Sequence, residues 1–584
     1  MIHAEKLAFG FQSSDLFRDV SFTLEENCHC ALIGSNGTGK TTLMRLIREP
    51  ENYMFSGKLT RDGVGRIGYV SQFAIREGDQ SVTVYDYLCQ DFLALEQSIA
   101  DVCMQMESAE DMDAVMDRYQ ELLDEGEAMD ADNYEVNIRK QLKLAELENK
   151  ASLELEKLSG GELKLVQVIR QMLRRPGLLM MDEPDVFLDF ENLNGLRDLI
   201  NAYQGTLLVV THSRYLLAHC FDRIWHLENG DLQEFAGNFN AYSYSRLQKK
   251  IDLQIASVED EAEVQRLGEM VDRLREIAEE KADPQRGRAL RSKVSYLNRL
   301  MSRQIKAPFV EIRQPEIRLP AVDEVDADEV LLRLDNYNLS FDEKLLEAVS
   351  FVVHAGEKVA LVGANGTGKT SMLREISRNQ NPAIHFSEGA VPALFSQLHA
   401  EILNEQNTIY QEFLDIGFET REQVEEYLQQ YCFDPDSLGR RVGNLSGGEK
   451  NLLQLALLAA GRANILLLDE PSSHLDTFAQ IALEEAIAAY PGAVLMVSHD
   501  FYTIVNCADT ILFVENGGIR PMSARAFRKM IYKKHFSRDY LELELQKKDM
   551  ETRIARCLEA GDCAEAQRLC DKLADIVEQM SSAS

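Results

Sequence analysis

Short, uninterrupted apolar runs recur along the chain, and each is followed directly by a polar residue. One run, at 178–181, precedes Asp182, and another, at 465–468, precedes Asp469. Apolar runs of this length are typical of strands that are buried on both faces of a parallel sheet. The pattern therefore predicts an α/β fold with parallel sheets.

Two further apolar runs have the same form. Residues 207–211 precede His212, and residues 493–498 end next to His499. Because parallel sheets bind ligands at the carboxyl ends of their strands, we expect these polar side chains to line ligand sites.

Three other segments have apolar residues at helical spacing. Residues 95–140 predict a two-helix arm, and residues 243–281 predict a long charged helix that ends near Asp283-Pro284 and is followed by a second helix. After residue 530 the pattern predicts an antiparallel helix pair around Gly561. The apolar positions of the arm are Leu95, Ile99, Val102, Met106, Met112, Val115, Met116, Tyr119 and Leu122.

The chain carries two copies of one set of motifs. Gly-x-x-x-x-Gly-Lys-Thr occurs at 34–41 and at 363–370, and Leu-Ser-Gly-Gly-Glu occurs at 158–162 and at 445–449. In both copies 24 residues separate the Ser of the second motif from a Glu, and 29 residues separate that Glu from a His. This agreement indicates that one unit was duplicated and that both halves carry the same chemistry.

The first motif is a phosphate loop. Its glycines allow a turn in which backbone N–H groups point at the β- and γ-phosphates of a nucleotide, the Lys neutralises them, and the Thr hydroxyl binds Mg²⁺. The predicted ligands of the copies are therefore ATP and Mg²⁺. The residues assigned to the nucleotide by this motif are Gly34, Asn36, Gly37, Gly39, Lys40, Thr41 and Thr42 in the first copy, and Gly363, Asn365, Gly366, Gly368, Lys369, Thr370 and Ser371 in the second.

An acidic pair ends one apolar run in each copy. Asp182 and Asp469 suit the coordination shell of Mg²⁺, which leaves Glu183 and Glu470 to polarise the attacking water. Thr41 and Thr370 complete the direct ligands that we predict for the metal.

One His and one Gln recur in each copy. A His that follows an apolar strand is usually structural, but the repeated spacing favours contact of His212 and His499 with the γ-phosphate. Gln72 and Gln397 lie 32 and 28 residues after the loop lysines, which favours contact with water bound to Mg²⁺.

Composition narrows the class of protein. No stretch approaches the roughly 18 apolar residues of a membrane-spanning helix, and the first residues lack the pattern of a secretory signal. The ten cysteines contain no CxxC pair, which is typical of reduced thiols in the cytoplasm and argues against structural zinc. The formal net charge of −34 would ordinarily argue against a nucleic-acid partner.

One segment contrasts with this acidic average. Residues 285–310 contain no acidic side chain, and Arg side chains bind phosphates in a bidentate manner, so the segment suits RNA or DNA. Pairing with the acidic helix that precedes it is the alternative, and both contacts are compatible with the sequence. The basic residues are Arg286, Arg288, Arg291, Lys293, Arg299, Arg303 and Lys306.

Together these motifs resemble the ATP-binding cassette (ABC) family, with its nucleotide motifs present twice. A pair of cassettes without a membrane domain and with a helical-hairpin linker resembles the ABC-F branch of that family. The resemblance implies a first cassette at 1–242 with its arm at about 95–140, a linker at 243–325, a second cassette at 326–530 and a helical tail at 531–584.

The resemblance also implies composite sites, because the cassettes of this family close head to tail. One site would combine the catalytic residues of the first copy with Ser446, Gly447 and Gly448, and the other would combine those of the second copy with Ser159, Gly160 and Gly161. Phe11 and Phe341 occupy the positions where the family stacks an aromatic ring on adenine, although packing within the adjoining strand is an equal alternative.

By resemblance, the function is that of a cytoplasmic ATPase, a monomer with paired cassettes, that binds the ribosome in its closed, ATP-bound state. Its basic linker would approach rRNA, peptidyl-tRNA and the peptidyl-transferase region, so as to tune or rescue translation or to protect against antibiotics. The arm carries fifteen acidic residues and one basic residue between Asp91 and Asn137, so it should meet basic protein or solvent. The alternatives are an energising subunit of a membrane transporter and a DNA-associated ATPase.

The two copies differ in the segment that follows the catalytic Glu. The first copy has Asp185, Val186 and Phe187, where the second has Ser-Ser-His at 472–474. Because this loop crosses to the other cassette in the family, we expect the two sites to hydrolyse ATP at unequal rates.

Overall fold

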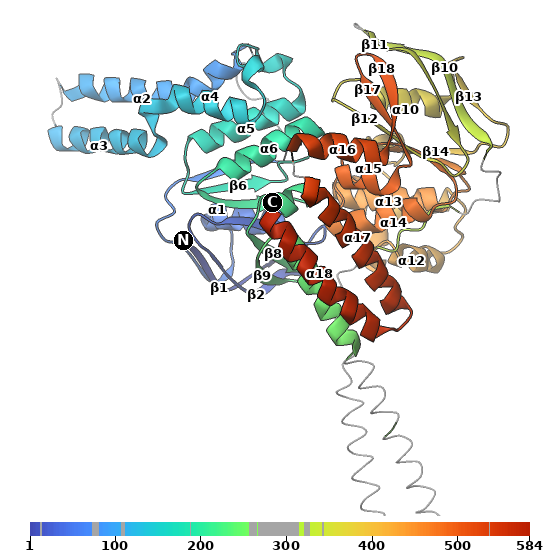
Figure 1. Ribbon diagram of the computed structural model, residues 1–584. Helices are drawn as coiled ribbons and strands as arrows, with labels where there is room; N and C mark the ends of the chain where they lie inside the picture. The colour runs from blue at the N-terminus through green and yellow to red at the C-terminus, as the bar shows by residue number, and fades with distance from the viewer. Residues whose placement is uncertain are drawn as a thin grey trace, which may run out of the picture. The chain divides into compact units, whose positions relative to one another are not determined.

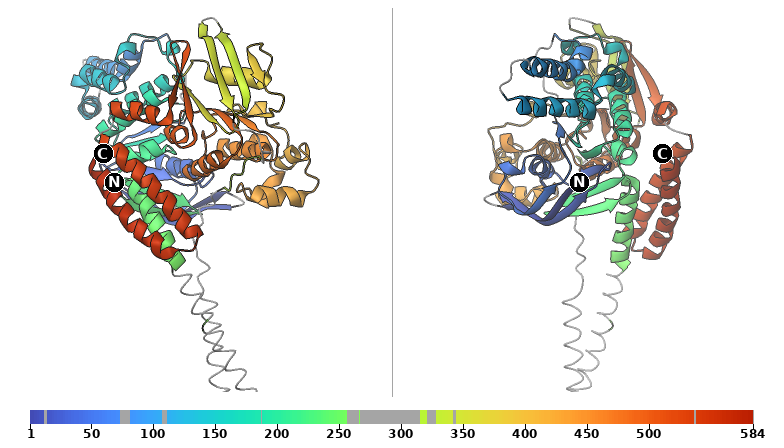
Figure 2. Two further views of the ribbon diagram at one scale, coloured as in Figure 1. Left: turned by 45° about the vertical axis from the view of Figure 1, so that its right-hand side comes forward. Right: turned by 90° about the vertical axis from the view of Figure 1, so that its left-hand side faces the viewer.

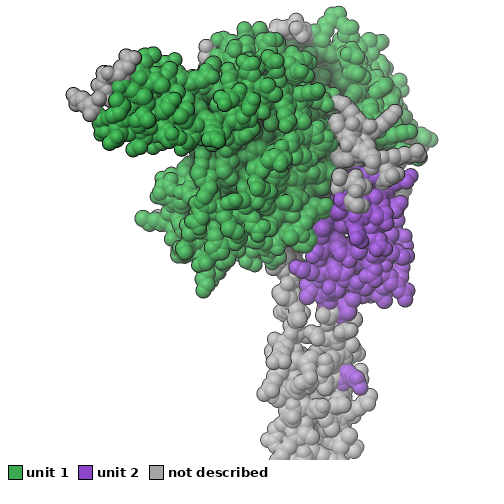
Figure 3. Space-filling model, turned by 60° about the vertical axis from the view of Figure 1, so that its left-hand side comes forward, with its two compact units in different colours: residues 1–238, 313–530 green, residues 239–312, 531–584 purple. Residues whose placement is uncertain are grey.

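A computed structural model describes residues 1–11, 14–72, 81–106, 111–186, 188–255, 266, 315–320, 328–341, 344–535 and 538–583 of the protein (Figure 1). The chain divides into two compact units, residues 1–238 with 313–530 and residues 239–312 with 531–584 (Figure 3). The first unit contains both cassettes.

Within the described residues, the first cassette has a six-stranded sheet and a three-stranded sheet. Neighbouring strands of the larger sheet run parallel except for the antiparallel pair at one edge, β8 and β9. In spatial order the larger sheet contains β5 (Ile67–Val70), β6 (Leu178–Asp182), β7 (Thr206–Val210), β3 (His29–Ile33), β8 (Arg223–Glu228) and β9 (Asp231–Ala236), and the smaller, antiparallel sheet contains β2 (Ser14–Leu24), β1 (Ile2–Phe11) and β4 (Ser56–Arg61).

The second cassette repeats this topology strand for strand in the part of the chain that is described, which confirms the duplicated fold predicted from the motifs. Its larger sheet contains β14 (Pro392–Phe395), β15 (Ile465–Asp469), β16 (Ala493–Val497), β12 (Lys358–Gly363), β17 (Thr510–Glu515) and β18 (Gly518–Ser523), and its smaller sheet contains β11 (Lys344–His354), β10 (Val330–Ser340) and β13 (Ile384–Phe386).

The predicted apolar runs form the centres of the two larger sheets. Every residue of β6, β7, β15 and β16 is buried, as expected for strands covered on both faces. Burial of each such Leu, Ile or Val side chain stabilises the fold by roughly 1.5–3 kcal/mol. The sheets therefore hold the loops at their carboxyl ends on a rigid base.

Helices cover the sheets and carry the motifs. In the first cassette they are α1 (Lys40–Arg48), α4 (Tyr134–Leu144), α5 (Gly160–Leu173), α6 (Phe190–Ala202) and α7 (Arg214–His219), and in the second they are α10 (Lys369–Arg378), α11 (Ile409–Leu414), α12 (Arg421–Gln429), α13 (Gly447–Ala459), α14 (Thr477–Ala489), α15 (Phe501–Cys507) and α16 (Ala524–His535). Among the described helices, none is long and apolar enough to cross a membrane.

The inserted arm consists of α2 (Val84–Met106) and α3 (Met112–Met129), which lie side by side in Figures 1 and 2. Leu95, Val102 and Leu122 are buried between them, which confirms the predicted helical arm. Met112 and Met116 are instead about half exposed, because α3 packs on α2 along one face only. The first helix also begins earlier than predicted, so the arm continues directly from the cassette.

The second compact unit is a bundle of three helices in the described part of the chain. Residues 239–255 are helical and pack against α17 (Arg538–Glu559) and α18 (Cys563–Ala583), with Ile251 and Leu573 fully buried (Figure 2). Gly561, at φ 75°, turns the chain between α17 and α18, which confirms the predicted helical tail. The sequence did not predict that the start of the linker joins this pair.

The basic segment at 285–310 and most of the acidic helix before it lie outside the described residues. The predicted linker contacts of Arg286, Arg288, Arg291, Lys293, Arg299 and Arg303 therefore stay predictions.

Candidate functional site

The two phosphate loops connect the central strand of each larger sheet to a helix, β3 to α1 and β12 to α10. Gly34 approaches the backbone of β8 so closely that an added Cβ would lie 2.0 Å from the carbonyl oxygen of Leu227, so no larger residue fits. The Nζ atom of Lys40 donates to the carbonyl oxygens of Gly34 and Ser35 at 2.8 and 2.9 Å.

The second loop has the same geometry. Lys369 Nζ donates to the carbonyl oxygens of Gly363 and Ala364 at 2.9 and 2.7 Å. Burial lowers the pKa of both loop lysines from the ordinary value. Both copies thus place a buried amine in a loop of backbone groups, and the residues that follow it, Thr42 and Ser371, lie in the first turns of α1 and α10.

A hydroxyl and a carboxylate meet at the start of each of these helices. Thr41 Oγ1 lies 3.3 Å from Asp182 Oδ1, and Thr370 Oγ1 lies 2.8 Å from Asp469 Oδ1. Burial raises the pKa of both aspartates. In the described structure Asp469 Oδ2 is buried without a hydrogen-bond partner. Oxygen donors with a free, buried carboxylate oxygen fit Mg²⁺.

The glutamates that follow adopt a left-handed backbone conformation, with φ of 44° for Glu183 and 51° for Glu470. Each backbone amide donates to the next strand, to Val210 at 2.8 Å and to Val497 at 2.9 Å. Such conformations cost about 1–3 kcal/mol and are typical of functional positions. Here each carboxylate is close enough to the loop lysine of its own cassette to interact with it, Glu183 with Lys40 and Glu470 with Lys369.

Burial is the main cause of raised pKa values at these two carboxyl groups. It raises the pKa of Glu183 to about 7, with a further contribution from Asp185 and Asp182, and it raises the pKa of Glu470 to about 8. Carboxyl groups that titrate near neutrality are suited to accept a proton from water.

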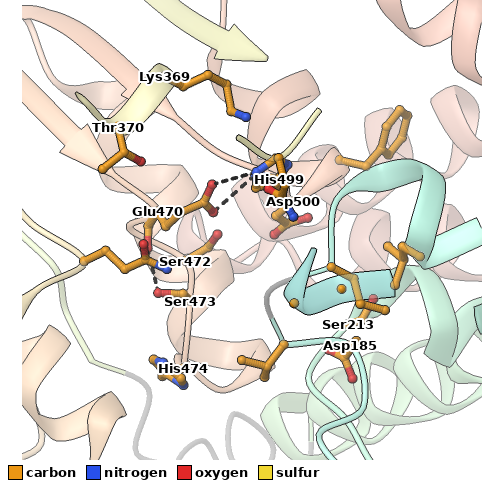
Figure 4. A pocket seen from close by; sticks show the side chains of 18 of the residues that line it. Asp185, Ser213, Lys369, Thr370, Glu470, Ser472, Ser473, His474, His499 and Asp500 are labelled. Atoms are coloured by element: carbon orange, nitrogen blue, oxygen red, sulfur yellow. Dashed lines mark hydrogen bonds and ion pairs between the residues drawn. The ribbon is translucent and has the colours of Figure 1, made fainter. Parts of the chain in front are cut away.

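The histidines differ between the copies. The backbone amide of His499 donates to Glu470 Oε2 at 3.2 Å, and its Nε2 lies 3.7 Å from Oε1 (Figure 4). By contrast, Gln72 Nε2 donates to Glu183 Oε2 at 2.6 Å, and neither ring nitrogen of His212 has a hydrogen-bond partner among the described residues. Burial lowers the pKa of both histidines, to about 3 for His499, so both rings are neutral.

Each cassette completes the loop of the other through an aspartate. Asp476 Oδ2 accepts a hydrogen bond from the backbone amide of Asn36 at 3.3 Å, and Asp189 Oδ2 accepts one from the amide of Asn365 at 3.2 Å. In addition, the side chain of Asn36 donates to the carbonyl oxygen of His474 at 2.8 Å. These reciprocal bonds place the two cassettes head to tail.

The Ser-Gly-Gly motifs begin α5 and α13. Ser159 and Ser446 each cap their helix in a capping box, with Glu162 and Glu449 as the partner side chains. The resulting helix N-termini present backbone amides to the opposite cassette, where an anion is favoured.

We define site 1 by Lys40, Asp182, Glu183 and His212 of the first cassette, opposite residues 446–448 of the second. At this site, a Cβ added to Gly448 would lie 1.9 Å from Asn36 Nδ2, so the signature glycine touches the opposite phosphate loop. The structure therefore brings the two halves of site 1 into contact.

We define site 2 by Lys369, Asp469, Glu470 and His499, opposite residues 159–161. A cavity of about 600 Å³ lies here, and most of these residues line it together with Thr370 and Gln397 (Figure 4). Ser159, Gly160 and Gly161 line the same cavity from the first cassette. Both composite sites implied by the sequence are thus assembled.

The structure describes the side chain of only one of the two aromatic residues that were predicted to contact adenine. Phe341 follows β10 and is 68 % exposed, so packing within the strand, the alternative left open by the sequence, is wrong for this residue. The side chain of Phe11 lies outside the described part of the structure, as does Phe187. Contact with adenine stays a prediction for both rings.

Several site residues were not identified from the sequence. Asp189 and Asp476 follow a Leu at the same place in both copies, and this repeated Leu-Asp pair is the signal that could have identified them. Asp185 is also part of the cavity wall, where Thr211 Oγ1 donates to its Oδ1 at 2.6 Å and burial raises its pKa to about 6.

The family model described as ABC transporter matches residues 17–186 and 346–473. Relatives are similar over most of their length. The chain is 27% identical to the Bacillus subtilis protein YfmR, over 89% of this chain and 82% of that protein. It is 26% identical to Arabidopsis thaliana ABC transporter F family member 2, over 89% of this chain and 77% of that protein. It is 27% identical to the Haemophilus influenzae energy-dependent translational throttle protein EttA, over 85% of this chain and 88% of that protein.

Two solved structures share the fold. Archaeal ribosome recycling factor aABCE1, in complex with ribosomal stalk protein aP1, matches with a TM-score of 0.53 and 19% identity over 91% of this chain and 92% of that one. Ribosome-bound archaeal Pelota and ABCE1 gives a TM-score of 0.52 and 19% identity over 92% and 82%.

Proposed function

Because the chain belongs to the ABC family of ATPases, and within it to the ABC-F branch, we propose that it hydrolyses ATP at two composite sites in order to act on the ribosome. The observation that carries the proposal is the reciprocal pair of bonds from Asn36 to Asp476 and from Asn365 to Asp189. A nucleotide bound on either phosphate loop would thereby join the two cassettes.

The chemistry at each site follows from the chain's own residues. Lys40 and Lys369 neutralise the phosphates, and the backbone amides of the loops and of the opposite signature helices bind their oxygens. Mg²⁺ bound with the nucleotide, held by the Thr–Asp pairs at 41 and 182 and at 370 and 469, would supply further charge neutralisation.

Glu183 and Glu470 each take a proton from the attacking water as it bonds to the γ-phosphorus, while the bond to the β-phosphate oxygen breaks. His212 and His499, which are neutral and buried, contact the γ-phosphate. Gln72 and Gln397 would contact water bound to Mg²⁺, and Phe11 and Phe341 would contact the adenine.

The ribosome is proposed as the partner from the relatives and the linker. EttA is named as a translational throttle, and the structural neighbours are a ribosome recycling factor and a ribosome-bound complex. In the closed, ATP-bound state the basic segment at 285–310 would contact rRNA and approach peptidyl-tRNA. Such contacts would serve to tune or rescue translation or to protect against antibiotics.

Co-sedimentation with ribosomes tests the proposal. The variant Glu183→Gln/Glu470→Gln should bind ATP without hydrolysing it and should therefore stay on ribosomes in an ATP-dependent way. Changing Arg286, Arg288, Arg291 and Lys293 to Ala in this background should weaken binding and reduce its dependence on salt. A matched control changes four exposed lysines outside the linker, Lys58, Lys140, Lys529 and Lys572, to Ala and should leave binding unchanged. Recovery in the membrane or DNA-bound fraction instead would support the transporter or DNA alternative.

A further inference from the structure

One buried ion pair joins the two cassettes beside site 2. The guanidinium of Arg214, at the start of α7, donates to Glu484 of α14, with Nη1 at 3.2 Å from Oε2, and lies 3.4 Å from Asp500 Oδ2. The side chain of Arg214 is 10% exposed and that of Glu484 is 8% exposed. The ring of Tyr502 lies 4.8 Å from the guanidinium carbon. A buried arginine from the first cassette is thus surrounded by groups of the second.

The carboxylates that Arg214 contacts hold the segment that carries His499. Asp500 caps α15 by accepting from the amide of Tyr502 at 2.9 Å, and it accepts from Thr503 Oγ1 at 2.9 Å. Glu484 accepts from the same Thr503 hydroxyl at 3.1 Å. His499, directly before Asp500, donates its amide to Glu470. A continuous set of contacts therefore leads from Arg214 to the glutamate of site 2.

At the duplicated positions, all of which the structure describes, the residues beside site 1 cannot form an equivalent ion pair. With the constant offset between the copies, Arg214 corresponds to Phe501, Glu484 to Arg197, and Asp500 to Ser213. Phenylalanine and arginine cannot form an ion pair. Arg197 instead donates to Asp198 and to Tyr215 within its own cassette, and Phe501 packs near Phe190 at 5.9 Å.

We propose that Arg214 is a positioning residue supplied by the first cassette to site 2, where it holds Asp500 and Glu484 and so fixes His499 against Glu470. Closure of the cassettes delivers the guanidinium, so site 2 is completed by closure in a way that site 1 is not. Removal of Arg214 leaves the buried carboxylate of Glu484 and the partly buried carboxylate of Asp500 without their shared cation, which displaces the loop of His499. The inference rests on the proposed roles of Glu183 and Glu470.

The test measures ATP hydrolysis in variants with one working site. In Glu183→Gln only site 2 can hydrolyse ATP, and in Glu470→Gln only site 1 can. In the Glu183→Gln background, Arg214→Ala should lower kcat about tenfold with little change in KM, and Arg214→Lys should recover part of the loss because it restores the charge without the bidentate geometry. In the Glu470→Gln background, Arg214→Ala should change kcat by less than about twofold.

Glu484→Gln provides a second, milder change at the same contact. It should also lower kcat of site 2 alone, and combined with Arg214→Ala it should add little, because both changes break one contact. Arg223→Ala, which removes a partly exposed ion pair with Glu25, is the matched control and should leave both backgrounds unchanged. Equal losses in the two backgrounds, or no loss at site 2, would overturn the inference. Wild-type hydrolysis by the Glu183→Gln/Glu470→Gln variant would instead overturn the proposed roles of the glutamates.

Discussion

The carboxylate of Asp189 accepts a 3.2 Å hydrogen bond from the backbone amide of Asn365, although the two residues belong to different cassettes. Its other oxygen accepts from the amide of Asn192 at 3.0 Å and thereby caps α6. One side chain therefore links the start of a helix in the first cassette to the phosphate loop of the second. Asp476 makes the reciprocal link to Asn36.

Two substitutions of Asp189 distinguish the effect of the helix cap from the effect of the hydrogen bond between the cassettes. Asp189→Ala removes both and should lower the free energy of unfolding by about 1 kcal/mol through loss of the cap. Asp189→Asn keeps an oxygen for the cap but presents an amide N–H to the amide of Asn365. We expect the Asn variant to keep wild-type stability in urea denaturation while ATP hydrolysis falls several-fold. Wild-type hydrolysis in Asp189→Asn would contradict a role for the bond between cassettes.

Gly448→Ala should disrupt the contact between the cassettes at site 1. The new Cβ would lie 1.9 Å from Asn36 Nδ2 and 2.6 Å from the carbonyl oxygen of His474. The side chain of Asn36 must therefore move, and its hydrogen bond to His474 across the two cassettes is lost. We expect hydrolysis to fall by about tenfold or more, which corresponds to about 1.4 kcal/mol of lost transition-state stabilisation.

Gly439→Ala is the control for this change, because a Cβ at this position meets no atom within 4 Å. Its hydrolysis rate should match that of the wild type. If Gly448→Ala hydrolyses ATP at the wild-type rate, then the contact with Asn36 is not required for turnover.

The sequence predicted the parts of the site that each cassette builds alone. Repeated apolar runs fixed the strands that end in Asp182 and Asp469, and repeated spacing identified the phosphate loops. Such features are local, because a strand and the loop that follows it are determined by neighbouring residues. The head-to-tail pairing came from resemblance alone, and the structure supplies its contacts.

What the sequence did not predict depends on residues far apart in the chain. Arg214 and Glu484 are 270 positions apart and occupy unlike positions in the two copies, so no repeat marks them. Likewise, the helix at 239–255 packs on α18, more than 300 residues later. Apolar spacing predicts that such helices have a buried face but not which helix covers it.

Ion pairs made by the carboxylate of Asp91 hold the base of the arm against the cassette. Asp91 of α2 accepts from Arg170 of α5 at 2.8 and 3.0 Å and from Arg174, the residue that caps the end of α5, at 2.7 and 2.6 Å. Asp91→Ala leaves two partly buried guanidinium groups without their partner. We expect the free energy of unfolding, measured by urea denaturation, to fall by about 3 kcal/mol.

The exposed arm residue Asp117 provides the matched control, since Asp117→Ala should change stability by less than about 0.5 kcal/mol. Although burial alone would raise the pKa of Asp91, the bonds from Arg170 and Arg174 hold it well below the ordinary value. Its contribution should therefore be present above about pH 4 and should be lost as the pH falls further. Equal stability of the two variants at pH 7 would show that the arginines are satisfied in another way.

The two sites should respond differently to pH. Burial raises the pKa of Glu183 to about 7 and that of Glu470 to about 8, and only the ionised carboxylate can accept a proton from water. We expect kcat of the variant with site 1 alone, Glu470→Gln, to rise with pH and to level off above about 7. For site 2 alone, Glu183→Gln, the rise should extend to about pH 8. Rates measured between pH 6 and 9 test this difference, with exposed Glu191→Gln as a control that should leave both profiles unchanged.

The free energy of unfolding reports the raised pKa of Glu470 without requiring ATP hydrolysis. The pKa of Glu470 is raised in the folded state above the ordinary value of 4.5, so the folded state binds the proton more tightly. Folding stability contributed by this group is therefore greatest below pH 4.5 and decreases as the pH rises to about 8. Glu470→Gln removes this penalty and should raise the free energy of unfolding by on the order of 3 kcal/mol more at pH 9 than at pH 5. An equal effect at both values would show that Glu470 is ionised throughout, and the later rise at site 2 would then need another titrating group.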